Sequence, residues 1–491
     1  MDSTATDNSF LSTRRGKLIL ALVCLAAFLD VIDTTIVNVA LPSIREHIDF
    51  SVQSVQWIAS GYLLTYGGFL LLGGRAADLL GRRRLFVTGT IVFAGSSLAC
   101  GLAGSEGMLI SARLAQGLGA AMMTPAALSI LTTTFSEGKD RTKAIGLWSA
   151  TIPLGAVIGV LAGGVLTQSI GWRWVFFVNL PVCAIVLTGA FRLLADDGKH
   201  ASLKEFDALG AVLSTAGMLG LVYVLVNAPI AGWGSVRTIG GLAGAIAILG
   251  LFVVTELRHR NPLFPLSIFR IKGIAAANAT QVIAQAGFYS MFFFVTLYMQ
   301  NVLGLSPIEA GAAYIPVTIG VGMSTGVATK LLPRIGSRPI IMTGALTGAA
   351  GVFWLAQIPV SGSYLADVLP GLVVMALGLG AIFVGVQTAA NAGVPADKAG
   401  LAAALGTASA QLGSALGLAV FTAIATSHTQ HLLSAHVDPN AALTSGFHYA
   451  LIACGIFLVA ASVIAFRTSN SRSSTSTAEA SVAPELLADA A

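Results

Sequence analysis

Hydrophobic residues form long, nearly continuous stretches along the chain, and polar residues are gathered in short intervals between them. A helix needs about 20 apolar residues to cross the hydrocarbon core of a bilayer, so stretches of this length predict transmembrane helices. Fourteen such segments are present, at residues 18–41, 53–74, 85–104, 107–131, 142–168, 173–194, 207–228, 236–257, 273–299, 307–329, 339–358, 365–390, 400–426 and 445–467. The pattern predicts an all-α integral membrane protein.

Two of the polar intervals resemble each other. "GGRAADLLGRRR" lies between the second and third segments, and "TKLLPRIGSRP" lies between the tenth and eleventh. In each, a basic residue (Arg75, Lys330) stands six positions before a glycine (Gly81, Gly336), and the two loops are offset by 255 residues. Matching loops in two halves indicate two parallel helix bundles, although any basic cytoplasmic loop has some of this character.

The repeat predicts how the chain is divided. We expect a cytoplasmic N-tail at 1–17, an N-terminal six-helix bundle at 18–194, a cytoplasmic linker at 195–206, two extra central helices at 207–257, a cytoplasmic loop at 258–272, a C-terminal six-helix bundle at 273–467 and a disordered cytoplasmic tail at 468–491. The tail is assigned as disordered because it is rich in Ser, Thr and Ala.

Composition and charge agree with a membrane protein. Of the 491 residues, 55% are hydrophobic and only 10% are charged, whereas a soluble domain carries about 25% charged residues. When both termini are placed in the cytoplasm, 23 of the 27 Lys and Arg residues fall in cytoplasmic segments. This bias sets membrane orientation, so the net charge of +5 does not indicate nucleic-acid binding. Arg113 is the one Lys or Arg that lies well inside a predicted segment and not at its end.

Cysteine and histidine offer no clear metal site. All four cysteines fall inside apolar segments without the spacing of a ligand set, and we expect packing roles for them. The longest outer loop is predicted near 427–444 and contains His428, His431 and His436. A His-x-x-His pair could bind metal, but an exposed loop poor in carboxylates favours solvated side chains. We therefore predict no metal site and no cofactor.

The first segment carries two carboxylates in the stretch "LDVIDTTIVNVALP". A charge at mid-bilayer costs about 2.5–3.5 kcal/mol on insertion scales, so Asp30 and Asp33 are expected to have a function. With Thr34 and Asn38 they fall within an arc of about 140° on one helix, which must face a cavity or a partner. Arg113 lies about 9 Å and Asp33 about 12 Å from the outer ends of their segments, so the two could pair.

Several motifs carry a resemblance to a known family. The first repeat loop is similar to a family signature, with Gly74, Asp78, Gly81, Arg82 and Arg83 in register. "LISARLAQGLGAA" is similar to a fourth-helix motif that includes Arg113 and Gln116. "GAVIGVLAGGVL" resembles an antiporter motif at its glycines, which are Gly155, Gly159, Gly163 and Gly164. Val160 stands there in place of the motif proline, and the glycines could equally serve ordinary helix packing.

These motifs, with "QWIASGYLL" and "GWRWVFFVNLP", resemble the major facilitator superfamily and its fourteen-span drug/proton antiporter branch. The resemblance runs from Leu29 to about Phe466. It implies a transporter of the bacterial cytoplasmic membrane that acts as a monomer in lipid. It also implies that the first repeat loop is a conformational latch.

The residues and the resemblance together predict a proton-coupled antiporter that exports a small lipophilic compound, cationic or amphipathic, by alternating access. Protons would pass through Asp33 and Asp30, with Arg113 as their partner, and the two acids would titrate as a coupled pair. Polar residues expected around the substrate cavity are Asn38, Thr34, Tyr62, Gln116, Asn179, Gln281, Gln285, Tyr289, Gln387, Asn391 and Gln411. Each of these could instead form an interhelical hydrogen bond.

Two alternatives belong to other classes. A transporter of the same fold could move one specific metabolite, inward by symport for example. A membrane receptor or an embedded enzyme would require a large soluble domain or a catalytic cluster. The sequence offers no loop beyond about twenty residues, no nucleophile–base pair and no Walker-type loop, so we predict neither an enzyme nor an ATP-driven pump.

Overall fold

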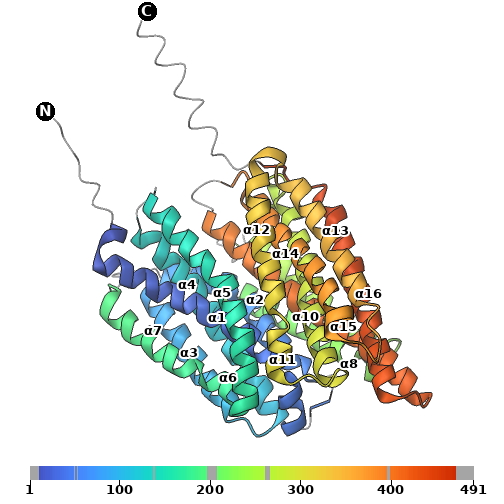
Figure 1. The fold of residues 1–491 in the computed structure, drawn as a ribbon. Coiled ribbons are helices and arrows are strands. Elements are labelled where there is room, and N and C mark those ends of the chain that lie inside the picture. Colours follow the sequence, from blue (N-terminus) through green and yellow to red (C-terminus); the bar gives the residue numbers. More distant parts are fainter. Residues whose placement is uncertain are drawn as a thin grey trace, which may run out of the picture.

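The computed structural model describes residues 10–48, 50–51, 54–135, 139–195, 207–259, 262, 266–394 and 399–471. Within these residues the regular structure is helical and contains no strand (Figure 1). The predictions for most of the N-tail, for the linker and for the C-terminal tail fall largely outside the described residues. Ten helices of the described part are long and apolar enough to cross a membrane. The chain is therefore a multi-pass membrane protein, while the count of fourteen spans stays a prediction.

The first group of helices follows the sequence from the N-terminal side. It comprises η1 (Phe10–Ser12), α1 (Arg14–Ile48), α2 (Gln56–Leu80), α3 (Arg82–Gly101), α4 (Glu106–Thr134), α5 (Lys139–Ser169), α6 (Trp174–Phe177) and α7 (Asn179–Leu193). These helices gather on one side of the molecule in Figure 1. We call this group the first bundle.

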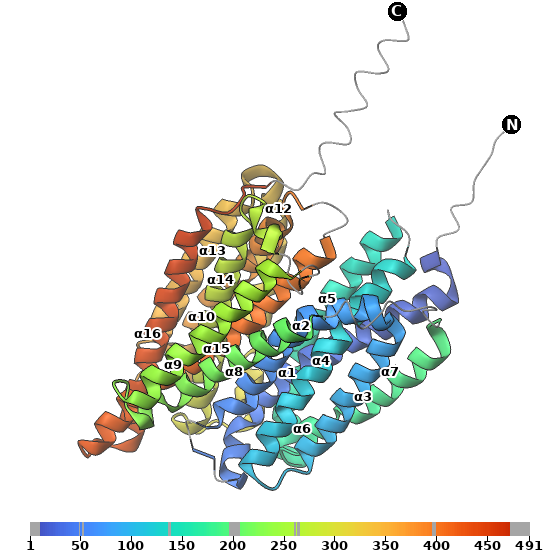
Figure 2. The ribbon, with the colours of Figure 1, turned by 180° about the vertical axis from the view of Figure 1, so that it is seen from behind.

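The second bundle lies beside the first. It comprises η3 (Leu266–Arg270), α10 (Ile274–Asn301), α11 (Pro307–Ala312), α12 (Ile315–Ile335), α13 (Ser337–Leu355), η4 (Tyr364–Val368), α14 (Leu369–Asn391), α15 (Ala399–Ser434) and α16 (Pro439–Ala465). Between the two bundles in sequence come α8 (Ala208–Ala231) and α9 (Val236–Arg258). Helix α8 contacts α2, α15 and α9, so it touches both bundles, and α9 lies outside it (Figure 2).

Both repeat loops form the same tight turn. Gly81 joins α2 to α3 with φ +101°, and Gly336 joins α12 to α13 with φ +85°, a region that glycine enters without steric cost. Arg83 Nη2 donates to the Phe191 carbonyl at 3.3 Å, near the end of α7. Arg338 Nη2 donates to the Thr468 carbonyl at 2.7 Å, just beyond α16. Each loop is thus tied to the last helix of its own bundle.

We call the face that carries these turns, together with Phe10 and Ser471, the terminal face, and the other end the opposite face. Near the opposite face the bundles are joined by hydrogen bonds. Gln300 Nε2 on α10 donates to the Val39 carbonyl on α1 at 3.0 Å. The Ile308 amide on α11 donates to Gln168 Oε1 on α5 at 3.3 Å.

The prediction of a long outer loop near 427–444 is wrong. Helix α15 continues to Ser434 and α16 begins at Pro439, so only residues 435–438 connect them. Asp438 Oδ1 accepts the Asn440 and Ala441 amides at 3.0 Å and caps α16. His428 stacks on Tyr449 with ring centroids 3.9 Å apart, so this histidine belongs to a helix pair. Hydropathy detects the part of a helix that crosses lipid, and these helices extend beyond it.

Candidate functional site

The Asp33 carboxylate on α1 is held by three side chains from two other helices. Arg113 Nη1 on α4 donates to Oδ2 at 2.6 Å, forming an ion pair with both side chains at most 1% exposed. Gln116 Nε2 on α4 and Asn179 Nδ2 on α7 each donate to Oδ1 at 2.7 Å. A buried charge is tolerated only when it is paired and hydrogen-bonded, and this carboxylate satisfies both conditions.

Arg113 is equally well surrounded. Its Nε donates to the Ile58 carbonyl on α2 at 2.8 Å, and its Nη1 donates to Gln116 Oε1 at 2.8 Å. The guanidinium carbon lies 4.3 Å from the centroid of the Tyr62 ring, where the negative face of the ring attracts a cation. The planar fork of arginine suits this set of partners better than a lysine ammonium would.

Ser97 on α3 is a member of this network that sequence reasoning missed. Its Oγ accepts from Gln116 Nε2 at 3.2 Å and from Asn179 Nδ2 at 2.9 Å, and donates to the Phe176 carbonyl at 2.9 Å. Ser97 therefore orients both amides that hold Asp33. A lone serine in an apolar segment carries no signal of this role in one sequence.

Asp30, one turn earlier on α1, is held by two tyrosines of α2. The Tyr62 hydroxyl donates to Oδ1 at 2.6 Å and the Tyr66 hydroxyl donates to Oδ2 at 2.7 Å. Tyr66 was not predicted, although its position four residues after Tyr62 puts both on one helix face. Gln411 of α15 also interacts with Tyr66, and a Cβ at Gly67 would lie 2.9 Å from the Gln411 Cβ. Asp30 is thus linked through Tyr66 to the second bundle.

The glycines of α5 bring that helix close to the one that carries the acids. A Cβ at Gly155 would lie 3.1 Å from Val31 Cβ, and a Cβ at Gly163 would lie 2.7 Å from the Ile36 carbonyl. Between them, a Cβ at Gly159 would overlap the Thr35 hydroxyl. Gly164 instead faces α11, where its Cβ would lie 2.7 Å from the Pro307 carbonyl. Three of the four glycines therefore allow α5 to pack closely on α1, and the fourth allows the contact between the bundles.

The polar residues expected around a cavity fall into three groups. Tyr62, Gln116 and Asn179 point into the buried network and form interhelical hydrogen bonds there. Thr34 Oγ1 donates to the Asp30 carbonyl of its own helix at 2.9 Å, and the Tyr289 hydroxyl donates to Asn38 Oδ1 across the two bundles at 3.5 Å.

The remaining residues of the set, apart from Gln411 on α15 described above, lie on α10 and α14 of the second bundle. Gln281 and Gln285 are on α10, and Gln281 is 8% exposed. Asn391 Nδ2 on α14 donates to the Gln387 carbonyl at 2.8 Å. The described contacts do not join these four to the carboxylates. The Asp78 side chain of the predicted latch lies outside the described part, and Arg82 begins α3 directly after the turn.

Buried acids and an arginine inside a set of membrane-crossing helices are typical of a transporter. The chain matches the family of the Major Facilitator Superfamily over residues 23–418. It is 35% identical over 475 residues to the puromycin resistance protein pur8 of Streptomyces alboniger, covering 95% of this chain and 94% of that protein. It is 37% identical over 457 residues to the cephamycin export protein CmcT of Amycolatopsis lactamdurans, covering 92% of each.

Solved structures share the fold at low identity. The POT family transporter PepTSo is 15% identical, with a TM-score of 0.65 over 92% of this chain and 98% of that one. A bacterial homologue of the human lysosomal transporter Spinster, inward-facing and occupied, is 19% identical, with a TM-score of 0.64 over 93% and 97%. The chain belongs to the Major Facilitator Superfamily, as the motifs indicated. It is a transporter and not an enzyme.

Proposed function

We propose that the protein is a proton-coupled antiporter that exports lipophilic, cationic or amphipathic drugs or antibiotics by alternating access. The observation that carries the proposal is the buried pair of Asp33 and Arg113, 2.6 Å apart. The printed names of the relatives, puromycin resistance and cephamycin export, support the substrate class. A specific-metabolite transporter of the same fold has no comparable support.

Proton coupling follows from what happens when Asp33 gains a proton. The neutral acid no longer attracts Arg113, so the pair separates, and the guanidinium keeps its contacts with the Ile58 carbonyl and the Tyr62 ring. Return of Arg113 expels the proton. The site takes up a proton while it is open to one side of the membrane and releases the proton while it is open to the other side. Antiport results when substrate moves in the opposite direction in the same cycle.

Within the proposal, the paired arrangement of Asp33 and Arg113 is the step of the cycle that follows proton release. Asp33 is paired, and the bundles are joined near the opposite face by Gln300 and by Gln168. In the proposed cycle the terminal face is cytoplasmic and open at this stage, so the substrate enters from there. Protonation at the other side of the membrane then accompanies substrate release.

Asp30 would communicate with the second bundle. Its carboxylate accepts from Tyr66, and Tyr66 also interacts with Gln411 on α15. Protonation of Asp30 weakens the charge-assisted hydrogen bond to Tyr66 and frees Tyr66 to change its contact with α15. Asp30 thus acts as a second proton site or as an anchor for a cationic substrate.

The energy required is modest. One elementary charge crossing 100 mV supplies about 2.3 kcal/mol, which sustains roughly a 50-fold concentration gradient. The proton gradient alone therefore drives export, without a further cofactor. Within the proposal the turn at Gly81, with Gly74, Asp78, Arg82 and Arg83, acts as a latch, and the polar residues of α10, α14 and α15 line the substrate cavity.

The proposal also includes the number of helices, their division into bundles and the orientation of the chain in the membrane. Fourteen helices would form two six-helix bundles, at 18–194 and 273–467, with two central helices at 207–257. Both termini would face the cytoplasm of a bacterium, and one chain in lipid would be the functional unit. Lys and Arg asymmetry between loops supports this orientation.

Everted membrane vesicles test the function. A preformed proton gradient with an acidic vesicle interior should discharge when ethidium is added to vesicles that contain the protein, and vesicles without it should not respond. Uptake of ethidium should stop when a protonophore is present. Uptake that survives the protonophore, or a gradient that ethidium leaves intact, contradicts antiport of this substrate class.

A further inference from the structure

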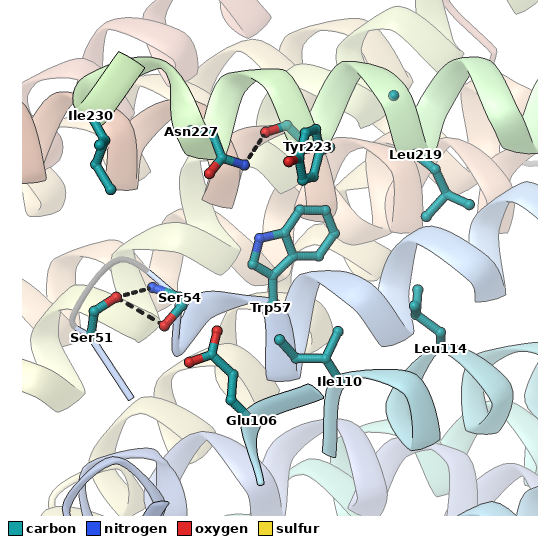
Figure 3. A pocket seen from close by; sticks show the side chains of 11 residues that line it. Ser51, Ser54, Trp57, Glu106, Ile110, Leu114, Leu219, Tyr223, Asn227 and Ile230 are labelled. Carbon is teal, nitrogen blue, oxygen red and sulfur yellow. Dashed lines mark hydrogen bonds between the residues drawn. The ribbon is translucent and has the colours of Figure 1, made fainter. Parts of the chain in front are cut away.

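A groove separate from the carboxylate site opens between the first bundle and α8 (Figure 3). Its volume is about 600 Å³, within the range of sites that hold drug-sized ligands. Its lining residues come from the start of α2, the start of α4 and one side of α8. They are Ser51, Ser54, Trp57, Glu106, Ile110, Leu114, Leu219, Gly220, Tyr223, Asn227 and Ile230.

The two walls present complementary chemistry. Trp57 rises from α2 toward Tyr223 on α8, so two aromatic rings border the same space (Figure 3). Tyr223 is 62% exposed, which is high for an aromatic side chain of a buried interface. Aliphatic side chains, Leu114 and Leu219 among them, complete the apolar surface. The groove therefore suits a ligand with a large hydrophobic body.

The charge in the groove is negative. Glu106, in the first turn of α4, directs its carboxylate toward the space below Trp57 (Figure 3). Among the described residues that line the groove, none is Lys, Arg or His. A phosphate or a carboxylate would find no cationic partner on these walls, whereas a cation would meet one carboxylate and two ring faces.

We propose that this groove binds amphipathic organic cations, at a lateral site distinct from the carboxylate pair. The positive centre lies between Glu106 and the rings of Trp57 and Tyr223, and the hydrophobic body lies along α4 and α8. The ligand class is argued from the groove itself and agrees with the proposed export function, whereas the lateral site goes beyond that function. Because α8 also contacts α2 and α15, a bound cation lies against the helix that touches both bundles.

A reporter in the groove tests this with the full-length protein in phosphatidylcholine nanodiscs. Ile230 lines the groove and is 71% exposed, so Ile230→Cys can carry a bimane fluorophore after the four native cysteines are replaced. Titration with tetraphenylphosphonium should change the bimane emission with saturation. Glu106→Gln and Tyr223→Ala should each raise the midpoint roughly three- to tenfold. Glu46→Gln, an exposed carboxylate on α1 outside the groove, is the matched control and should leave it unchanged.

Tetraphenylborate separates charge recognition from simple hydrophobic binding, because it has the same shape and the opposite charge. It should bind more weakly than the phosphonium, and Glu106→Gln should not weaken it further. Equal midpoints for the two ions, or a phosphonium midpoint unaffected by Glu106→Gln, overturns the proposal. A reporter that ignores the phosphonium and responds when phosphatidylethanolamine replaces phosphatidylcholine identifies a lipid as the occupant, and also overturns it.

The ethidium discharge in vesicles is measured on the same variants. Normal discharge by a protein whose groove reporter does not respond refutes only the lateral site. A groove that binds the phosphonium in a protein that discharges no gradient refutes only the export function.

Discussion

At the scale of single residues, the central feature is a charge pair in a place where neither charge could remain alone. Asp33 is fully buried and Arg113 is 1% exposed. Beyond the pair, Asp33 accepts from two amides, and Arg113 contacts an amide oxygen, a backbone carbonyl and an aromatic ring. Breaking such a pair by removing one partner costs about 3–5 kcal/mol, because the other charge is left uncompensated. The site is therefore stable as a unit and sensitive to a change in either charge.

Arg113→Met is expected to lower the unfolding free energy by about 3–5 kcal/mol, because Asp33 loses its counter-charge. Combining it with Asp33→Asn should restore at least half of the loss, since the double variant buries no charge. Thermal midpoints from fluorescence-detected size exclusion measure this. A double variant that is less stable than the sum of the two single changes would contradict the pairing.

Tyr66→Phe should slow ethidium export by roughly tenfold while ethidium binding stays within twofold, because a hydrogen bond to a charged acceptor contributes about 1.5–3 kcal/mol. Tyr66 donates to Asp30 and also interacts with Gln411, so the change affects coupling between bundles. Tyr449→Phe is the control, since Tyr449 is 51% exposed and its ring stacks on His428. Equal rates in both variants would remove Tyr66 from the mechanism.

How much of the site the sequence predicts depends on the kind of residue. Asp30, Asp33 and Arg113 are visible because a charge in an apolar segment is costly and demands a reason. Ser97 and Tyr66 are not visible, because uncharged polar residues are common in such helices and their partners depend on helix rotation. Only the packing of the other helices around α1 brings Tyr66 to Asp30 and places Ser97 against the amides that hold Asp33.

At the scale of helices, the glycines of α5 decide how closely the acid-bearing helix is held. Gly155, Gly159 and Gly163 follow one face, four residues apart, and each approaches backbone or Cβ atoms of α1. Small residues allow such approach between membrane helices, where van der Waals packing is the main attraction. Gly164 lies on a neighbouring face and approaches α11, so one helix contacts both α1 and the second bundle.

Gly159→Ala should destabilise the protein by about 1–3 kcal/mol, because the added methyl group overlaps Thr35 and forces α5 away from α1. Ethidium export should fall with it. Gly95→Ala on α3 is the matched control, since a Cβ there meets nothing within 4 Å. Thermal midpoint and export rate are measured on both variants, and a Gly159→Ala protein indistinguishable from Gly95→Ala refutes the close contact as a functional element.

Hydropathy predicted where most helices lie but not where they break or end. The segment predicted at 307–329 consists of α11 and α12 with a break at Ala313 and Tyr314, and α11 starts at a capping box formed by Ser306 and Glu309. Such caps are readable in sequence. The extension of α15 to Ser434 is not, because helix beyond the lipid no longer needs an apolar composition.

At the scale of the whole molecule, the two bundles are joined near the opposite face, while each repeat loop at the terminal face is tied to its own bundle. Arg83 reaches Phe191 and Arg338 reaches Thr468, both within one bundle. No pattern in one sequence could predict this arrangement, because it depends on how the two bundles are placed relative to each other. In the proposed cycle, the contact between α5 and α11 opens during transport.

Gln168→Cys combined with Ile308→Cys tests this opening in a background without native cysteines. The Ile308 amide lies 3.3 Å from Gln168 Oε1, so a short crosslinker with two thiol-reactive groups should join the two helices in the resting protein. Ethidium export should stop after crosslinking, and a cleavable crosslinker should restore it on reduction. Export that continues at full rate with the link in place excludes opening at this contact.

The most direct test of the central claim is the proton discharge of everted vesicles that carry Asp33→Asn. The account predicts that ethidium no longer discharges the gradient in this variant, while exchange of labelled for unlabelled ethidium, which needs no proton, persists. Glu46→Gln should discharge like the unaltered protein. If Asp33→Asn vesicles discharge the gradient at the normal rate, proton coupling does not pass through Asp33 and the account is contradicted.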